Sequence, residues 1–286
     1  MKIKAFAKVN LALAVLGKRP DGYHNIESIM QSVSLYDEIE LQKSEAGISL
    51  DCSDDNIKRE ENLCYKAAKI FIEKAAQKGI ILGCGIKVQK KIPVAAGLGG
   101  GSVDAAAVLV GLNELADKIF CYDELCSMAL QLGADVPFCI KGGTALAKGI
   151  GEELTELLPL PDCFIVVSKK GIKSSTGDMY RKLDSLKNPK LPKINSILKG
   201  IESGNLESSF FGAYNSFEQA CDEAVAVRDA LDDLPFVYCG LSGAGPSVIS
   251  VFKTEQDAET AENRLKSMGH EAFLTVPVNS ANQIVE

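Results

Sequence analysis

The sequence predicts an α+β fold of two domains, and three observations support this. Strand-like and helix-like hydrophobic periods alternate along the first half of the chain. A proline-containing stretch at 157–162, Leu-Leu-Pro-Leu-Pro-Asp, is typical of a linker or hinge. The length of 286 residues fits one large domain or two ordinary ones. We therefore expect an N-terminal domain over 1–155 and a C-terminal domain over 156–286.

The N-terminal stretch is predicted to be a strand, although it superficially resembles a secretory signal. Lys8 and Asn10 interrupt its apolar run, and no small-residue cleavage pattern follows. Apolar residues occupy the odd positions, namely Ile3, Ala5, Ala7, Val9, Leu11, Leu13 and Val15. In a strand, this alternation places Lys8 and Asn10 together on the opposite face.

Further elements follow from the same periods and from turn signals. Before the linker, strands are predicted at 39–41, 48–52 and 86–88, and helices at 63–75, 102–115 and 125–132. Gly79 and Gly133 end the first and the last of these helices. After the linker, strands are predicted at 164–167, 237–241, 248–252 and 272–276. Helices are predicted at 179–186, 194–201 and 217–231, with one more between the last two strands.

Composition restricts the partners that the protein can have. Hydrophobic residues make up 46% of the chain and charged residues 24%, as in soluble globular proteins. The net charge is −7, and no run of Lys or Arg is long enough to follow a nucleic-acid backbone, so nucleic acid is not expected as a partner. No apolar run approaches the length of a membrane span. Any phosphate must therefore be held by local geometry against an unfavourable overall charge.

Cysteine and histidine usage argues against disulfide and metal sites. The nine cysteines are scattered and contain no C-x-x-C pair, which fits a reducing cytoplasm better than a disulfide framework or a zinc site. His24 and His270 are the two histidines and lie far apart in the sequence, so no histidine-based metal cluster is expected.

A glycine-rich loop at 93–103 is the strongest single motif. Its residues are Pro93, Val94, Ala95, Ala96, Gly97, Leu98, Gly99, Gly100, Gly101, Ser102 and Val103. Glycines let backbone N–H groups approach an anion closely, and the start of the following helix favours phosphate. We expect Ser102 to cap that helix. The loop lacks the lysine of a Walker motif, and Ser102 stands where a dinucleotide fingerprint needs glycine. The alternative is a flexible turn without a ligand.

Asp135 lies in the segment 132–138, after a helix stop and among apolar residues. Pro137 is expected to hold Val136 in an extended conformation. A partly desolvated carboxylate suits a general base. The alternative is a turn aspartate that bonds its own backbone.

A second glycine turn at 241–248 lies between two predicted strands. Its sequence, Leu-Ser-Gly-Ala-Gly-Pro-Ser-Val, lets one backbone approach another backbone or a ligand. The alternative is an ordinary hairpin loop.

The order of these segments resembles the GHMP kinase superfamily. The matching segments are 8–11, 93–102, 133–138 and 242–245, and the resemblance covers essentially the whole chain. It implies a two-domain GHMP kinase fold, with an N-terminal ribosomal-S5-domain-2-like domain and a C-terminal ferredoxin-like domain. A finer resemblance, to kinases of a cytidine-diphosphate-linked methylerythritol, rests on segment 18–28, Lys-Arg-Pro-Asp-Gly-Tyr-His-Asn-Ile-Glu-Ser, and on segments 97–102 and 132–138.

This resemblance implies ATP-dependent phosphorylation of the 2-hydroxyl of the methylerythritol, with Mg²⁺, in the non-mevalonate isoprenoid precursor pathway. Lys8 and Asp135 match the catalytic pair of the family. ATP is expected to place its phosphates on the glycine-rich loop while Asp135 accepts the hydroxyl proton and Lys8 orients Asp135. The sequence leaves open whether Asp135 acts as a base or mainly by positioning.

The resemblance also assigns binding residues. Asn10, Tyr23, His24, Thr176 and Tyr180 match positions on the substrate side, and Tyr23 and His24 match those that recognise cytosine. A helix cap and a half-buried aromatic are the alternatives for Thr176 and Tyr180, and a surface turn is the alternative for His24.

Two further residues and one departure concern the nucleotide side. Asn62 and Lys90 match positions near adenine, with a helix cap and a solvated strand-end charge as the alternatives. Ala244 stands where the family usually has serine. The carboxylate of Asp104 adds negative charge near the expected phosphate site, and the sequence does not decide its direction.

Three rival functions remain at this point. They are another kinase of the superfamily, for homoserine or mevalonate, a catalytically silent nucleotide-binding regulator, and a structural protein with glycine turns. Retention of both Lys8 and Asp135 argues against the second, and the 18–28 segment argues against the first. The oligomeric state, monomer or homodimer, stays open.

Overall fold

Two β-sheets organise the chain in the computed structural model, which describes residues 1–54, 57–171 and 175–285. The first sheet runs in the order β12 (Asn282–Ile284), β1 (Lys2–Lys18), β2 (His24–Ser44), β4 (Gly83–Gln89) and β3 (Ile48–Cys52). Strands β5 (Thr144–Lys148) and β11 (Pro277–Val278) also pair with β2, and β6 (Glu153–Glu156) pairs with β5. The second sheet has the order β10 (Glu271–Thr275), β7 (Phe164–Lys169), β9 (Val248–Phe252) and β8 (Tyr238–Leu241).

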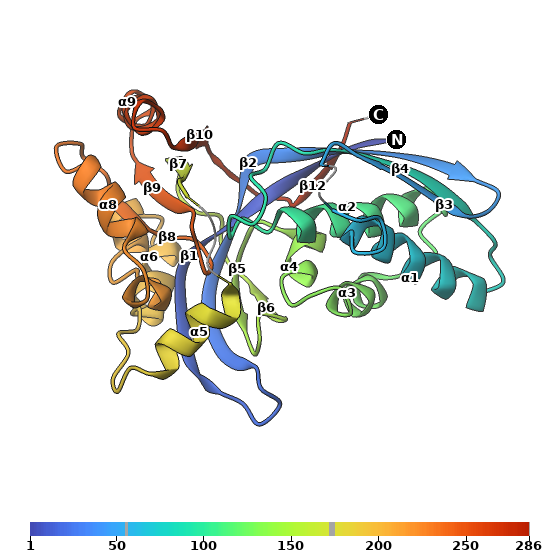
Figure 1. The fold of residues 1–286 in the computed structure, drawn as a ribbon, viewed down its shortest axis with the longest axis horizontal. Coiled ribbons are helices and arrows are strands. Elements are labelled where there is room, and N and C mark those ends of the chain that lie inside the picture. Colours follow the sequence, from blue (N-terminus) through green and yellow to red (C-terminus); the bar gives the residue numbers. More distant parts are fainter. Residues whose placement is uncertain (55–56, 172–174, 286) are drawn as a thin grey trace.

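The helices form two groups, one beside each sheet (Figure 1). The first group packs against the first sheet and comprises α1 (Leu63–Gln77), α2 (Gly100–Leu115), α3 (Tyr122–Leu130) and α4 (Val136–Lys141). The second group comprises α5 (Thr176–Asp184), α6 (Ile194–Glu202), α7 (Leu206–Ser209), α8 (Glu223–Ala230) and α9 (Glu255–Ser267). Among the described residues, no helix is both long and apolar enough to cross a membrane. The mixed α+β architecture that the sequence predicts is confirmed.

Strand β1 confirms the predicted N-terminal strand and the shared face of Lys8 and Asn10, whose side chains bond each other. Its pairing with β2 shifts register between Phe6 and Lys8 and again between Asn10 and Ala12. Such bulges turn side chains relative to the regular alternation. The strand is buried over nearly its whole length, so Lys8 and Asn10 lie on a covered face rather than toward solvent.

Two local predictions are wrong at the starts of helices. Ser102 does not cap α2, because the helix begins at Gly100 with Gly99 as its N-cap in the left-handed conformation, φ 70°. Val136 is not extended, because it is the first residue of α4. Pro137 lies in the first helical turn, where the missing N–H has no intrahelical partner to lose.

From residue 144 onward the structure differs from the prediction in four places, one of which is the short helix α7 that the sequence did not indicate. The helix predicted at 217–231 is divided into the 3₁₀ helix η1 (Ser216–Gln219) and α8, and Asn215 caps η1 through its side chain. Strands β5 and β6 form a hairpin that the sequence did not indicate. The short strands β11 and β12 return the end of the chain to β2 and β1. The stretch 157–162 contains no helix or strand, and the domain boundary at 155/156 stays a prediction.

Candidate active site

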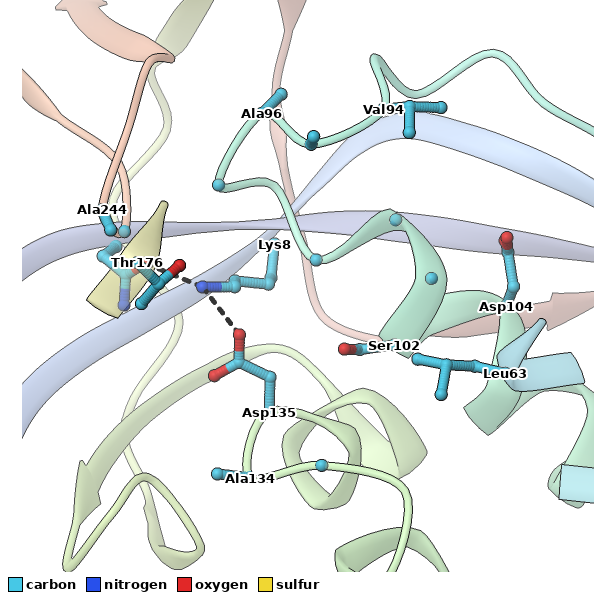
Figure 2. A pocket seen from close by; sticks show the side chains of 18 of the residues that line it. Lys8, Leu63, Val94, Ala96, Ser102, Asp104, Ala134, Asp135, Thr176 and Ala244 are labelled. Carbon is cyan, nitrogen blue, oxygen red and sulfur yellow. Dashed lines mark hydrogen bonds and ion pairs between the residues drawn. The ribbon is translucent and has the colours of Figure 1, made fainter. Parts of the chain in front are cut away.

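A cavity of about 600 Å³ opens where the first sheet, its helices and the second half meet. Most residues predicted to act in binding or catalysis line it, and Figure 2 shows many of them. They are Lys8, Asn10, Tyr23, Asn62, Lys90, Pro93, Val94, Ala95, Ala96, Gly97, Gly99, Gly100, Gly101, Ser102, Asp135, Thr176 and Tyr180. Three other predicted residues do not line the cavity. The side chains of Leu98 and Val103 are buried in the core, and His24 lies behind Tyr180.

The glycine-rich loop presents the open start of α2 to this cavity. No side chain caps the helix, and no acidic residue occupies its first turn. A Cβ at Gly99 would lie 2.8 Å from Cγ of Lys8, and one at Gly97 would lie 2.4 Å from the carbonyl oxygen of Ser242. Glycine is therefore required at both positions for close packing. The unpaired N–H groups and the positive end of the helix dipole make this helix start a site for an anion such as phosphate.

The second glycine turn braces the first, which confirms that it allows one backbone to approach another. The N–H of Ser247 donates to the carbonyl of Ala96 at 3.2 Å. The hydroxyl of Ser242 donates to the carbonyl of Gly97 at 3.2 Å and accepts the N–H of Asn10 at 3.3 Å. The loop is thus fixed between β1 and the turn that joins β8 to β9. Ala244 lines the cavity with its methyl group.

Lys8 and Asp135 face each other across the cavity (Figure 2). Nζ of Lys8 lies 3.2 Å from Oδ2 of Asp135, and the two side chains are 4% and 37% exposed. The ammonium also donates to Oδ1 of Asn10 at 2.9 Å, and Nδ2 of Asn10 donates to the hydroxyl of Ser28 at 2.8 Å. This chain of bonds fixes the direction of the ammonium. Asp135 precedes α4, but its carboxylate makes no capping bond, so it stays free to face Lys8.

Lys90 occupies a second, closed ion-pair site. Its ammonium bonds the buried carboxylates of Asp37 and Asp104, the latter at 2.6 Å. Burial lowers the pKa of Lys90, but the two carboxylates raise it more, so the net shift is upward. Burial raises the pKa of Asp104 to about 8 even though Lys90 opposes this. The interpretation of Lys90 as a solvated charge is wrong, and the carboxylate of Asp104 points away from Asp135 (Figure 2).

Helix α5 contributes Thr176 and Tyr180 to the lining of the cavity. Ser175 caps it by accepting the N–H of Asp178 at 3.0 Å, so the alternative of Thr176 as the cap is wrong. The ring of Tyr180 stacks on His24 at 4.4 Å and meets Phe217 edge-on at 5.0 Å. Burial, with a smaller contribution from the charge of Asp135, raises the pKa of Tyr180 to about 12. His24 is buried, so it is not the exposed turn residue that was the alternative.

Asn62 lies at the start of α1 and also lines the cavity. Its side chain caps α1 by accepting the N–H of Cys64 at 2.9 Å. The alternative of a helix cap is confirmed for Asn62, whereas its position near adenine stays a prediction.

The sequence did not indicate several residues of the site. The lining residues that were missed include Leu13, Ile26, Met30, Glu61, Leu63, Ile150 and Phe217. Most are ordinary hydrophobic residues that only the fold brings to the cavity. Asp37 did carry a signal, because it stands among Val33, Leu35, Ile39 and Leu41 at the apolar positions of its strand. A carboxylate at such a position predicts a buried charged partner.

Comparisons with known proteins identify the family of the chain. The family model described as GHMP kinases N terminal domain matches residues 62–143, and the one described as GHMP kinases C terminal matches residues 198–271. A 4-diphosphocytidyl-2-C-methyl-D-erythritol kinase of Clostridium beijerinckii is 40% identical over 284 residues, which cover 96% of this chain and 99% of that protein.

Solved structures share the fold. A crystal structure of 4-(cytidine 5'-diphospho)-2C-methyl-D-erythritol kinase matches with a TM-score of 0.82 and 32% identity, and the match covers 97% of this chain and 99% of that one. A homoserine kinase from Cytophaga hutchinsonii matches with a TM-score of 0.77 over 100% of this chain and 97% of its own, but at 17% identity it shows the fold alone. The chain belongs to the 4-diphosphocytidyl-2-C-methyl-D-erythritol kinase family of the GHMP kinases.

Proposed function

We propose that this protein transfers the γ-phosphoryl group of ATP to the 2-hydroxyl of 4-diphosphocytidyl-2-C-methyl-D-erythritol, giving the 2-phosphate and ADP. The observation that carries the proposal is one cavity that holds an open helix start for phosphate together with the facing pair Lys8 and Asp135. The 40% identity to a kinase of that name supports this substrate. A cytoplasmic location is part of the proposal and rests on the scattered cysteines of the sequence.

The chain supplies a place for each part of the nucleotide. The N–H groups at the start of α2 would hold phosphate oxygens, with Asn62 and Lys90 toward the adenine end. Among the described residues, no group of three or more His, Cys, Asp or Glu side chains could hold a metal ion alone. Mg²⁺ commonly takes one or two protein oxygens together with phosphate oxygens and water, and Asp135 and Ser102, which both line the cavity, would supply such oxygens. When bound, Mg²⁺ would neutralise charge that develops on the phosphates.

Asp135 and Lys8 would carry the chemistry. Asp135 accepts the proton of the 2-hydroxyl as its oxygen forms a bond to the γ-phosphorus and the bond from that phosphorus to ADP breaks. Lys8, fixed by Asn10, orients Asp135 and offsets negative charge beside the transferred group. Because phosphoryl transfer depends mainly on positioning and electrostatics, two such side chains are sufficient.

The acceptor would lie toward α5. Asn10 adjoins the catalytic pair, Thr176 stands at the tip of α5 on the Lys8 side (Figure 2), and Tyr23 and Tyr180 would meet the cytosine end. Tyr23 is 61% exposed, so its ring is free to cover a base from outside.

ADP release measured against a panel of alcohols tests the proposal. The panel contains 4-diphosphocytidyl-2-C-methyl-D-erythritol, homoserine and mevalonate, each with ATP and Mg²⁺. We expect turnover of the first alone. Turnover of homoserine or mevalonate at a comparable kcat/KM, or of none of the three, would refute the assignment.

A further inference from the structure

Asp184 makes a contact that the proposed chemistry does not use. It is the last residue of α5, and its Oδ1 lies 2.8 Å from Nε2 of His24, the first residue of β2. The two residues are 160 positions apart in the chain. The contact therefore ties the second half of the molecule to the hairpin of β1 and β2, where the side chain of His24 is only 6% exposed.

His24 acts behind the wall of the cavity, whereas Tyr180 forms part of the wall. The two rings are nearly parallel, with an interplanar angle of 13° and centroids 4.4 Å apart. Phe217 meets Tyr180 edge-on at 5.0 Å and also lines the cavity. Tyr180 thus rests on His24 with one face and is bordered by Phe217, and its position depends on the plane of the imidazole.

Asp184 and Tyr180 hold the same imidazole from one helix. They are four residues apart on α5, so both side chains project from the same face of the helix. Tyr180 contacts the flat face of the ring, and Asp184 contacts its edge. A carboxylate can only accept, so Nε2 of His24 carries the hydrogen and the ring cannot rotate without breaking this bond.

We infer that Asp184 is a positioning residue for the acceptor end of the cavity. It fixes the imidazole of His24, which in turn supports the ring of Tyr180 against which the base of the acceptor would lie. The inference rests on the proposed function for the identity of the acceptor. It does not rest on that function for the chain of contacts from Asp184 through His24 to Tyr180.

This arrangement predicts a selective kinetic effect. Neither Asp184 nor His24 lines the cavity beside the glycine-rich loop, and neither contacts Lys8 or Asp135 in the described structure. Loss of the Asp184 carboxylate should therefore raise KM for the acceptor and leave kcat and KM for ATP nearly unchanged. For Asp184→Ala we expect KM for the acceptor to rise about tenfold, as for loss of a hydrogen bond to a charged group. Asp184→Asn, whose amide oxygen can still accept from Nε2, should restore most of this loss.

A double-mutant cycle tests whether Asp184 acts through His24. Steady-state constants are measured for the wild type, Asp184→Ala, His24→Ala and the double variant, with thermal unfolding as a check on folding. If the contact carries the effect, the double variant has the same acceptor KM as His24→Ala alone. Arg181→Gln is the matched control, because Arg181 lies on the same helix with its side chain 75% exposed. It should leave every constant within about twofold.

The outcomes separate the inference from the proposed function. Three results would each overturn the role of Asp184. The first is that the effects of the two substitutions on the acceptor KM multiply, and the second is that Asp184→Ala leaves the acceptor KM unchanged. The third is that Asp184→Ala lowers kcat and raises both KM values in parallel. If the wild type phosphorylates homoserine or mevalonate instead, the proposed function fails, and the same cycle is read from KM for that alcohol. If it phosphorylates none of them, the cycle is read from the Kd of cytidine diphosphate by calorimetry, and equal Kd values in all four proteins would overturn the inference.

Discussion

Two lysines stand at the same cavity, each beside aspartate, and their surroundings are opposite. The ammonium of Lys8 has one carboxylate, Asp135, which is 37% exposed, and one neutral amide. The ammonium of Lys90 lies between two carboxylates whose side chains are 0% and 5% exposed. Both ammonium groups border the cavity, but the carboxylate that faces Lys8 is partly exposed, whereas the two that hold Lys90 are almost entirely buried. The same residue types thus form an accessible pair, which suits the proposed chemistry, and a buried cluster, which suits a structural role.

The closed site explains how the glycine-rich loop is held at both ends. Oδ1 of Asp37 accepts the N–H of Ile92 at 2.8 Å, just before the loop. Asp104 lies in α2, just after the loop, and Lys90 joins the two carboxylates. A Cβ at Gly100 would lie 3.2 Å from Nζ of Lys90, so the ammonium also packs directly beneath the loop. Lys90 is therefore placed to position the loop and not to act as a free cation toward phosphate.

The largest effect is expected at the open site. Asp135→Ala should lower kcat by roughly 10²–10⁴-fold if Asp135 takes the hydroxyl proton. Stability should fall less than at the closed site, because the carboxylate is partly exposed and caps no helix, and the ammonium of Lys8 keeps its bond to Asn10. Single-turnover phosphorylation and thermal unfolding measure the two quantities. Near-normal turnover in Asp135→Ala would remove Asp135 from the mechanism.

The next largest effect is expected at the closed site and concerns stability. Lys90→Met removes the cation that bonds the buried side chains of Asp37 and Asp104, so at least one buried negative charge loses its counter-charge, which should cost about 3–5 kcal/mol of unfolding free energy. Urea unfolding measures this loss. Lys91→Met is the matched control, because its ion pair with Glu38 is exposed and should be worth less than about 1 kcal/mol. Similar losses in the two variants would contradict the contrast between closed and exposed pairs.

The two sites also differ in how far the sequence could predict them. The period of two in β1 placed Lys8 and Asn10 together, and the glycine runs marked both loops, because such signals are local. The closed site joins residues of β2, α2 and the end of β4, and no local pattern encodes that convergence. The contact of His24 with Asp184 spans 160 residues and was invisible for the same reason.

Elements were missed where the local signal was weak or misleading. The hairpin of β5 and β6 consists of strands of five and four residues beside several glycines, which is too short for a clear period. Pro137 predicts an extended Val136, but the first turn of a helix accepts proline, and Val136 begins α4. The strands β11 and β12 have two and three residues and are defined by their pairing with β2 and β1.

A third prediction compares two glycines of the loop. Gly97→Ala places a methyl group 2.4 Å from the carbonyl oxygen of Ser242, at φ +78°, so the loop and the turn that braces it must separate. The left-handed backbone alone costs about 1–2 kcal/mol. We expect a several-fold weaker Kd for ATP and a lower unfolding temperature. Gly101→Ala is the control, because its methyl group would lie 3.4 Å from Cδ1 of Leu63 at ordinary contact distance. Equal effects of the two substitutions would contradict the bracing of the loop by the Ser242 turn.

The smallest expected effect is a change in how steeply the unfolding free energy depends on pH. It tests the closed site without removing Lys90. Burial raises the pKa of Asp104 from 3.8 to about 8, with Asp37 adding to the rise and Lys90 opposing it. Between pH 3.8 and about 8, the native carboxyl therefore keeps its proton while the carboxyl of the unfolded chain releases it. The unfolding free energy consequently falls as the pH rises through this range, and it levels off above pH 8. For one proton the slope cannot exceed about 1.4 kcal/mol per pH unit.

Asp104→Asn removes this titration and should flatten the dependence of the urea midpoint on pH between about 5 and 8. Asp233→Asn is the control, because the side-chain hydrogen bond from Arg264 lowers the pKa of that exposed carboxyl, which then titrates below the tested range. An unchanged slope in Asp104→Asn would mean that Asp104 stays ionised beside Lys90 across the whole range. In that case the closed site holds two full negative charges against one positive charge, and the cost of burying them must be offset by the bonds that Asp37 accepts from the loop.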